Sequence, residues 1–542
     1  MFINFADIPG HQKLFLDYLY DFNKVKKFYK NNVHDKDNYL SIFKRISAQK
    51  KVPRTQLTGI LTNQYNGLPL SSNTSKNIAI LSDNNTLAVV TGQQLGILGG
   101  PMYTLYKIIT AIKLSNYLSQ RHDDFNFVPV FWLEADDHDF NEVRSISVIN
   151  DSNEIKVISY GEEVSEDESK SSVGEIIFND SLNNFFAELE SSSRSTEFTA
   201  QLFSEIKSIY SPGKTFKQAF KELIFSFFDR YGLVIFDPQD KEIKNLLKPV
   251  FKKEISDFRI HTEKLVNISA QLEESYHAQV KVRPVNLFYK DADGRYLIEP
   301  GENEFGLKRK RKKFSYEELI DTIEKEPENF SPNVLLRPIC QDYILPTAFY
   351  VGGPSEIAYF AQVMPLYDFF GIEAPVIYPR SSATIIEKNI SSLLERYELK
   401  TDKVFKSGSG IKQQIINSLT SNSIDDIFNN ATNQIDAAFD SLKEKLFEFD
   451  KTVSDSSSKY KQKINQYLAE YKSKATEAQK RKHETTLRQI DKILNTIYPN
   501  ANLQEREINF IYFLNKYGKE FLDKVFDGTM INKFEHQIIE LG

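Results

Sequence analysis

The sequence predicts an α/β protein with a parallel-sheet core, inserted lobes and a carboxyl-terminal arm of coiled-coil helices. The core is indicated by an apolar β-branched run, Leu87–Thr91, followed by a glycine-rich turn, a helix over Pro101–Gln120 and a second strand, Val128–Leu133. A strand, helix, strand order implies parallel pairing. The arm is indicated from Ile424 onwards, where apolar residues recur in steps of three and four among Lys, Glu and Gln. Such spacing is typical of a coiled coil.

Length and composition limit the classes of protein. A chain of 542 residues is too long for one ordinary core, so we expect several domains. The net charge of −6 argues against nucleic acid as the main partner, and a single cysteine, Cys340, excludes an internal disulfide. We find no signal peptide and no apolar window near the ~20 residues of a membrane span. We therefore expect a cytoplasmic protein that binds neither nucleic acid nor a membrane.

Changes in composition along the chain divide it into five parts. An acidic, serine-rich stretch indicates an inserted lobe, and the run Gly232–Asp237 returns the chain to the sheet. A hairpin with Asp293-Gly294 at its turn indicates a smaller insertion. The predicted parts are 1–147, amino-terminal helices and the first part of the core; 148–231, the inserted lobe; 232–384, the second part of the core with a small hairpin insertion near 280–330; 385–500, the coiled-coil arm; and 501–542, helices packing back on the core.

The arm could also be a bundle of helices packed on the core, because such helices show a similar pattern. We favour a projecting coiled coil. Between its two apolar runs lies the segment TVSDSSS, Thr452–Ser458, which is either a turn or a weak point in one long helix.

The first glycine-rich turn is a candidate site for an anion. Ligands of open α/β folds bind at the carboxyl ends of strands, where a helix begins. Pro101 suits a first helical turn, and the free N–H groups and dipole of that turn favour negative charge. Alternatively, the tyrosines of this helix belong to the core and its lysine to the surface. The candidate binding residues are Gly92, Gln93, Gln94, Tyr103 and Lys107.

A group of acidic residues around one histidine follows the second strand. Carboxylates beside an imidazole could hold a cationic amine, hold a metal, or raise the pKa of the histidine for proton transfer. Helix caps and solvated loop charges are the alternative. A single cysteine and the lack of a second nearby histidine argue against zinc. The candidates are His138, Asp137 and Asp139 as catalytic residues and Asp136 as a binding residue, with Glu134 and Glu142 beside them.

A second cluster surrounds the turn VGGPS, Val351–Ser355, which leads into a helix over Glu356–Phe370 and a strand over Pro375–Tyr378. Arginines near the end of a strand, beside such a turn, can bind a carboxylate or phosphate with two parallel hydrogen bonds. Buried structural ion pairs are the alternative. Cys340 has no evident base and is interpreted as a small core residue. The candidate binding residues are Arg337, Gln341, Asp342, Gly353, Ser355, Glu356, Tyr359 and Arg380.

Four segments of the chain resemble the family that adds cysteine in bacillithiol biosynthesis. They are TGQQLGILGGPMYTLYK, PVFWLEADDHDFNEV, RPICQDYILPTAFYVGGPSEIAYFAQ and VIYPRSS, which occur in the expected order. One departure is visible: many members begin the acidic motif Glu-Asp-His-Asp, whereas this chain begins it with Asp136.

The resemblance implies a Rossmann-like core with inserted connecting lobes, similar in plan to class I aminoacyl-tRNA synthetases, and a coiled-coil arm used in homodimers. It also implies a ligase that joins cysteine to glucosaminyl malate by an amide bond in the last step to bacillithiol. Adenine nucleotide binding is associated with this family, so ATP or ADP is the expected cofactor, and no metal is expected.

The residues add a hypothesis to this resemblance. The Gly92 turn and Arg380 would hold malate or phosphate oxygens, the acidic loop would hold the cysteine ammonium or the sugar, and His138 would move the proton of the attacking amine. The alternative function is a non-catalytic scaffold that binds a small anion and recruits a partner through the coiled coil.

Overall fold

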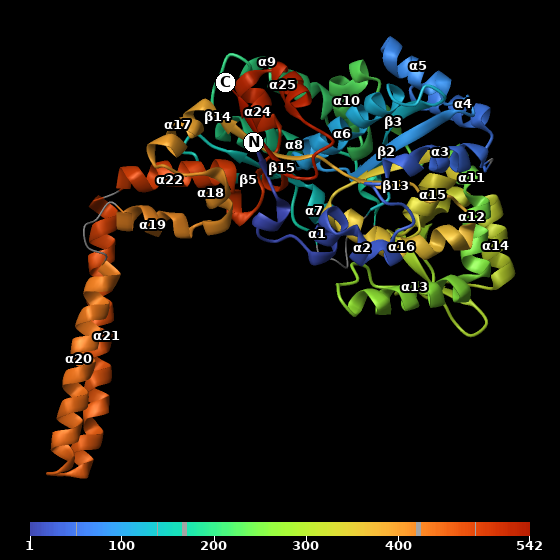
Figure 1. The fold of residues 1–542 in the computed structure, drawn as a ribbon. Coiled ribbons are helices and arrows are strands. Elements are labelled where there is room, and N and C mark those ends of the chain that lie inside the picture. The colour runs from blue at the N-terminus through green and yellow to red at the C-terminus, as the bar shows by residue number, and fades with distance from the viewer. Residues whose placement is uncertain (50, 138, 165–170, 419–423, 483, 542) are drawn as a thin grey trace. The chain divides into compact units, whose positions relative to one another are not determined.

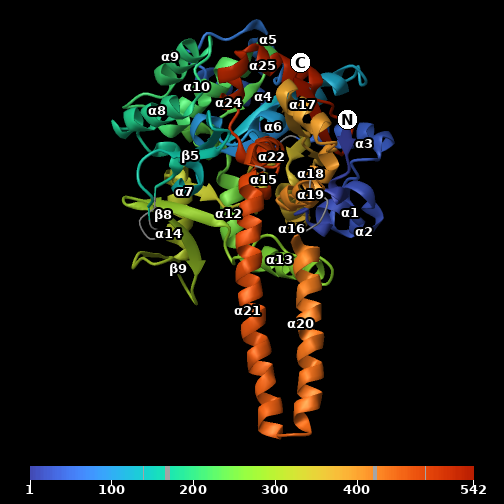
Figure 2. The same ribbon diagram turned by 90° about the vertical axis from the view of Figure 1, so that its left-hand side faces the viewer.

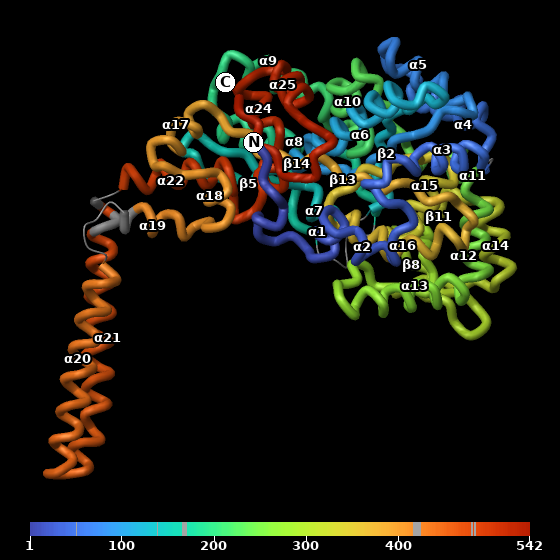
Figure 3. The backbone as a smooth tube through the Cα atoms, viewed as in Figure 1, coloured from blue at the N-terminus to red at the C-terminus, as the bar shows by residue number. Residues whose placement is uncertain are grey.

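The computed structural model describes residues 1–49, 51–137, 139–164, 171–418, 424–482 and 484–541 (Figures 1 and 3). It divides into two compact units. The first comprises Met1–Ile385 together with Asn502–Leu541, and the second is built from Ile386–Ala501. Within the described residues, no helix is long and apolar enough to cross a membrane.

The first unit contains the predicted parallel sheet. Its strands lie in the order β13-β12-β2-β3-β6, and every neighbouring pair is parallel. Its strands are buried almost throughout, as expected for a sheet covered on both faces. The predicted α/β fold class is thus confirmed. The five strands are β2 (Thr86–Gln94), β3 (Asn126–Glu134), β6 (Val234–Phe236), β12 (Thr347–Gly352) and β13 (Val376–Pro379).

The strand order reverses between β2 and β12. The connection from β2 leads towards β6, whereas the connection from β12 leads away from it. Right-handed crossovers therefore place the helices after β2 and β12 on opposite faces of the sheet. Ring contacts show that both faces of β12 are covered: Phe349 meets Tyr39 of α3 (Tyr39–Ala48) on one face, and the next residue, Tyr350, meets Phe360 of α16 (Pro354–Phe370) on the other. A reversal of this kind opens a crevice at the carboxyl ends of the strands.

The remaining strands form small sheets. The strand β1 pairs with β15 in a three-stranded sheet of order β1-β15-β14, so the two ends of the chain meet. The predicted hairpin forms between β7 and β8, but Ala292 and Asp293 make its loop and Gly294 pairs with Asp291. These strands are β1 (Phe2–Ile3), β4 (Ser145–Ile149), β5 (Ile155–Ser159), β7 (Leu287–Asp291), β8 (Gly294–Pro300), β9 (Phe305–Leu307), β10 (Lys313–Phe314), β11 (Phe330–Pro332), β14 (Ser382–Glu387) and β15 (His536–Leu541).

Helices of the first unit surround the sheets. They are α1 (Lys13–Tyr20), α2 (Phe22–Val25), α3 (Tyr39–Ala48), α4 (Arg54–Gln64), α5 (Ser72–Ile80), α6 (Tyr103–Ser119), α7 (Phe140–Val143), α8 (Ser181–Ser192), α9 (Thr199–Ile209), α10 (Phe216–Phe228), α11 (Lys241–Leu246), α12 (Lys248–Ser256), α13 (Phe258–Glu273), α14 (Tyr316–Lys325), α15 (Arg337–Ile344), α16 (Pro354–Phe370), α23 (Gln504–Glu507), α24 (Ile511–Tyr517) and α25 (Glu520–Gly528).

The helix after the first glycine turn differs from the prediction. It begins at Tyr103 instead of Pro101, and most of its residues are buried. It packs on β2 and β3, and Lys113 Nζ donates to the carbonyls of Phe526 and Thr529 in the carboxyl-terminal segment. The helix α6 therefore lies between the sheet and the carboxyl-terminal segment, and little of its surface is exposed to solvent.

The prediction that 148–231 forms an inserted lobe stays a prediction; the division into two units keeps these residues together with the sheet.

The second unit contains the coiled-coil arm. The helices α20 and α21 lie side by side and antiparallel, joined at one end (Figure 2). The segment Thr452–Ser458, expected as a turn or weak point, lies inside α21. The turn comes earlier, at 448–450, and Asp450 caps α21 by accepting from Val453 N–H. The helices of this unit are α17 (Lys388–Arg396), α18 (Thr401–Ser407), α19 (Gly410–Ser418), α20 (Ile424–Phe447), α21 (Lys451–Lys482) and α22 (Glu484–Ile497).

Two serines of this segment are buried within the helical part of the arm. Ser454 and Ser457 are buried, and Ser454 Oγ donates to the carbonyl of Lys443 at 2.8 Å. Small side chains let the two helices approach closely just after the turn.

Candidate functional site

A cavity of about 530 Å³ lies at the carboxyl ends of β2, β3, β12 and β13. This is the volume of a site for a small metabolite. All three groups of predicted site residues contribute to its wall. The predicted residues that line it are Gly92, Gln93, Gln94, Tyr103, Lys107, Asp136, Asp137, Arg337, Gly353, Ser355, Glu356, Tyr359 and Arg380.

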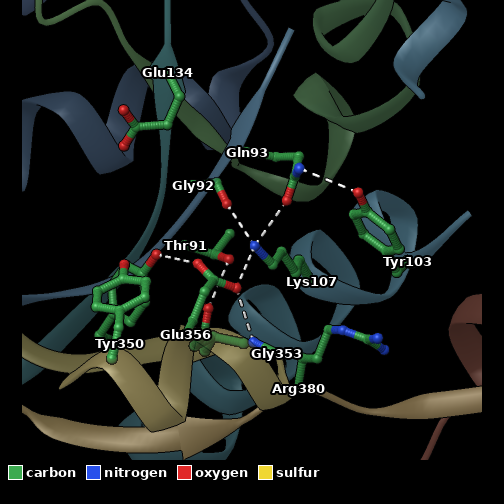
Figure 4. A network of polar contacts seen from close by, with 12 residues as sticks. Thr91, Gly92, Gln93, Tyr103, Lys107, Glu134, Tyr350, Gly353, Glu356 and Arg380 are labelled. Atoms are coloured by element: carbon green, nitrogen blue, oxygen red, sulfur yellow. Dashed lines mark hydrogen bonds and ion pairs between the residues drawn. The ribbon is translucent and has the colours of Figure 1, made fainter. Parts of the chain in front are cut away.

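Lys107 is held in place by the protein itself. Its Nζ donates to Gly92 O and Gln93 Oε1, both at 2.8 Å, and forms an ion pair with Glu356 (Figure 4). Glu356 also accepts from the Tyr350 hydroxyl and from Gly353 N–H. Burial lowers the pKa of Lys107, and Glu356 opposes this effect. Lys107 and Glu356 thus tie β2, α6 and α16 together and have little capacity left for a substrate.

Arg337 is also fully engaged. Its guanidinium donates to Gln341 Oε1 at 2.9 Å, to the Tyr359 hydroxyl at 2.8 Å and to the Tyr350 hydroxyl at 3.2 Å. The remaining nitrogen, Nε, lies 3.1 Å from Glu134 Oε1. The arginine therefore forms the structural ion pair that was the alternative to substrate binding, although it lines the cavity.

Glu134 is the carboxylate with the most strongly raised pKa in the cavity wall. Burial, opposed by Arg337 and assisted by Asp136 and Asp137, raises its pKa to about 7. Its Oε1 has the ion pair with Arg337 but no hydrogen bond. In Figure 4 Glu134 lies apart from the Lys107 network. A carboxylate in this state can take up or release a proton near neutral pH.

Arg380 pairs with a residue far away in the sequence. Its Nη2 lies 2.7 Å from Glu505 Oε1, and the Glu505 side chain is completely buried. Arg380 Nη1 donates to Ser381 O. Despite its burial, Glu505 has a lowered pKa, because Arg380 and nearby N–H groups favour the carboxylate.

The acidic loop is split between the cavity and a helix cap. Asp137 lines the cavity and accepts from Gln94, which also donates to Glu142 at 3.2 Å. Asp139 was expected beside Asp137, but it caps α7 by accepting from the backbone N–H of Glu142 and is not among the lining residues. Its position at the helix start explains the difference, since aspartate is a preferred N-cap. His138 lies outside the described residues.

Asp136 is bound by basic residues. Its carboxylate lies 3.0 Å from Lys244 Nζ and accepts from Gln239 at 2.8 Å. Burial acts to raise the pKa of Asp136, but Lys244 and Arg295 outweigh it and hold the pKa below its usual range.

The first glycine turn does not form the predicted anion site. Gly92 belongs to β2, where it pairs with Trp132. The following turn is covered by the carboxyl-terminal segment: Met102 N–H donates to Ile508 O, and Asn509 Nδ2 donates to the carbonyls of Leu98 and Gly100. The N–H groups of Gly96, Gly99 and Gly100 donate to carbonyls within the turn, and this segment contributes Gly92, Gln93 and Gln94 to the cavity wall.

The second turn also differs in detail. Glu356 accepts the Gly353 N–H at 2.8 Å, so a carboxylate of the protein occupies the start of α16. Ser355 remains exposed in the wall. Gln341 and Asp342 are buried behind the wall, where Gln341 donates to Asp342 at 2.7 Å and neither side chain lines the cavity. They lie further along α15, whose residues are nearly all buried, and Asp342 also accepts from the Tyr367 hydroxyl in the core.

Sequence reasoning missed three charged groups of the wall, namely Lys244, Arg295 and Arg506, whereas Glu134 and Glu142, which it named beside the acidic candidates, both line the cavity. Lys244 follows β6, whose carboxyl end lies at the same edge, and this position could have suggested it. Arg295 and Arg506 lie in an antiparallel hairpin and a returning segment, where no local pattern marks them. Cys340 touches the cavity, but burial raises the pKa of its thiol, which keeps it protonated. Within the described ranges, no group of His, Cys, Asp or Glu is arranged to hold a metal ion.

The fold and the site define a Rossmann-like α/β protein with a charged small-molecule cavity and a coiled-coil domain. Comparison with family models agrees: residues 1–381 match "Bacillithiol biosynthesis BshC, N-terminal Rossmann-like domain", and residues 383–541 match "Bacillithiol biosynthesis BshC, C-terminal coiled-coil domain". The chain belongs to the bacillithiol biosynthesis BshC family. The Rossmann-like core and the coiled coil expected from the sequence are both confirmed.

Curated relatives match along nearly the whole chain. A protein of Salinibacter ruber is 33% identical over 98% of this chain and 97% of its own length, and one of Chloroherpeton thalassium is 34% identical over 97% and 96%. A protein of Chlorobaculum tepidum is 30% identical over 98% and 97%. All three bear the name "Putative cysteine ligase BshC". These names are those of a ligase and give no support to a non-catalytic scaffold.

Proposed function

We propose that this protein is a cysteine ligase that joins the carboxyl group of cysteine to the amine of glucosaminyl malate, forming an amide in the last step of bacillithiol biosynthesis. Membership of the family and the names of its relatives support the ligase. The amide bond and the identity of the acceptor belong to the proposal.

One observation carries the chemistry: Glu134 is a cavity carboxylate whose pKa is raised to about 7 by burial. An amine attacks an acyl group only in its neutral form and loses a proton as the amide forms. A base with a pKa near the working pH accepts such a proton most effectively. We propose that Glu134 accepts it, while Arg337, 3.1 Å away, orients the carboxylate.

Two carboxylates near the end of β3 suit a cationic amine. Asp137 and Glu142 share the Gln94 amide and project from the end of β3 and the start of α7. We propose that they hold the cysteine ammonium. The role of His138 in moving a proton stays a prediction of the sequence, and Asp139 supports the loop as a helix cap.

Activation by ATP also stays a prediction. The two glycine turns do not provide a phosphate cradle, because one is covered by Ile508 and Asn509 and the other is capped by Glu356. We therefore derive no step through a nucleotide.

The arm is proposed to form a homodimer, and the cytoplasm is proposed as the compartment. Several large apolar side chains of α20 and α21 are exposed, among them Ile427, Tyr460, Tyr467 and Tyr471, with 52–69% of each residue accessible. A second copy of the arm would cover them.

A deletion strain tests the function. Loss of this gene should abolish bacillithiol and cause glucosaminyl malate to accumulate, and the wild-type gene should restore the thiol. Complementation with Glu134→Gln should fail, whereas Glu263→Gln, which changes an exposed residue of α13, should succeed. An unchanged thiol pool in the deletion strain would contradict the ligase.

A further inference from the structure

The short helix α23 is fixed to the edge of the first unit by two buried side chains. Gln504 exchanges hydrogen bonds with both backbone groups of Ile385, at 2.8 and 2.9 Å. Glu505 accepts from Ser382 Oγ and Ala383 N–H, both at 2.9 Å, and pairs with Arg380. These contacts hold the next residue, Arg506, at a defined place in the cavity wall.

Arg506 differs from the other basic residues of the wall. Its side chain is exposed and, within the described part of the chain, makes no ion pair or hydrogen bond. Arg337 and Arg380 are both paired with carboxylates. Arg295 donates to Ser331 Oγ at 2.7 Å and to Pro332 O at 2.9 Å.

The surroundings of Arg506 favour an anion. Arg380 lies beside it in the wall, and the guanidinium of Arg380 lies 5.5 Å from the ring of Tyr103. Of the acidic residues of the wall, Glu134 ends β3 and is paired with Arg337, Asp136 is paired with Lys244, and Glu356 is paired with Lys107. Among the described basic residues of the wall, Arg506 is therefore the one whose charge the protein does not itself pair.

We infer that Arg506 is the residue that recognises a carboxylate of the malate moiety in the acceptor. This inference rests on the proposed function. The glucosaminyl amine must reach the acyl group near Glu134, and the malate carboxylate then needs a cation of the wall that no carboxylate of the protein already pairs. A free guanidinium binds a carboxylate with two parallel hydrogen bonds. A phosphate is the other anion to consider, but both glycine turns nearby are closed to it.

The test compares two ligands that share the glucosamine ring, of which only one carries the malate group. The binding of glucosaminyl malate and of methyl glucosaminide to the full chain would be measured by calorimetry for wild type, Arg506→Ala and Arg506→Lys. We expect Arg506→Ala to weaken glucosaminyl malate binding by ~10–100-fold, because a hydrogen bond to a charged group is lost. The affinity of Arg506→Lys should lie between those of wild type and Arg506→Ala, since lysine keeps the positive charge but cannot donate two parallel hydrogen bonds. Methyl glucosaminide should bind equally to all three proteins.

Arg259→Ala is the control, because Arg259 is exposed on α13 and absent from the cavity. It should bind glucosaminyl malate like wild type. Equal binding of glucosaminyl malate by wild type and Arg506→Ala would overturn the role of Arg506 and leave the proposed function standing. Weakened ATP binding with unchanged glucosaminyl malate binding would overturn that role as well and assign the residue to phosphate. If the wild type binds no glucosaminyl malate, the proposed function fails and the inference with it.

Discussion

Replacing Glu134 by Gln is expected to make the protein more stable at alkaline pH while removing its activity. The folded state raises the pKa of Glu134 from 4.5 to about 7. A carboxyl group whose pKa is raised in the folded state binds its proton more tightly there than in the unfolded state. The protein therefore loses stability as the pH rises from 4.5 to 7. Gln resembles the protonated form and does not carry this cost.

The magnitude follows from the pKa shift. At 1.36 kcal/mol per pH unit, Glu134→Gln gains about 3 kcal/mol at pH 8 and about 1 kcal/mol at pH 5. These are upper values, because 23% of the Glu134 side chain is exposed and solvent screens it. For a unit of this size, ~1–2 °C of melting temperature corresponds to 1 kcal/mol. The variant should therefore melt ~3–5 °C above wild type at pH 8 and ~1–2 °C above it at pH 5.

Differential scanning fluorimetry at both pH values measures this difference, with the exposed Glu263→Gln as the matched control. The control should shift equally at both pH values. Bacillithiol formation by Glu134→Gln should fall by ~10²–10⁴-fold. A melting difference that does not change with pH would refute the raised pKa, and retained turnover would refute the role of Glu134 as the base.

Three further predictions concern the structure around the site and the arm. Arg380→Ala leaves the completely buried Glu505 without its partner and should lower the free energy of unfolding by ~3–5 kcal/mol, measured by thermal unfolding. The double variant Arg380→Ala with Glu505→Gln should recover part of this loss. Equal melting temperatures of the single and the double variant would contradict the ion pair. Gly99→Ala should destabilise more than Gly67→Ala, because both have φ near +85° but only the first Cβ would meet a ring, at 2.6 Å; equal melting would show that the ring yields. Tyr467→Glu should shift the mass measured by light scattering from dimer to monomer, since Tyr467 is 69% exposed on α21; an unchanged dimer would place the interface elsewhere.

The sheet was predictable because its strands carry their own signals. Leu87–Thr91 and Val128–Leu133 are β-branched and apolar runs, and the glycine turns and helices after such runs mark the crossovers. These features are local, so one sequence suffices. The same reasoning located the cavity, since the carboxyl ends of neighbouring parallel strands meet at one edge.

The role of each side chain in the cavity wall could not be predicted from the sequence, because its ion-pair and hydrogen-bond partners come from distant segments of the chain. Glu505 meets Arg380, and Lys244 meets Asp136, across more than one hundred residues of chain. The covering of the Gly96–Gly100 turn by Asn509 is equally distant. These contacts decide whether a basic group is free for a ligand, and no local pattern records them.

Two hydrogen bonds join Ile385 to Gln504 where the chain leaves and re-enters the Rossmann-like unit. The backbone leaves the Rossmann-like unit at one residue and re-enters almost beside it, so the intervening 116 residues are an insertion whose two ends are already joined in space. Closing so small a gap with a few glycines costs little loop entropy. The arm is therefore a removable module, and an excised version should keep its metabolite cavity while losing whatever the arm assembles.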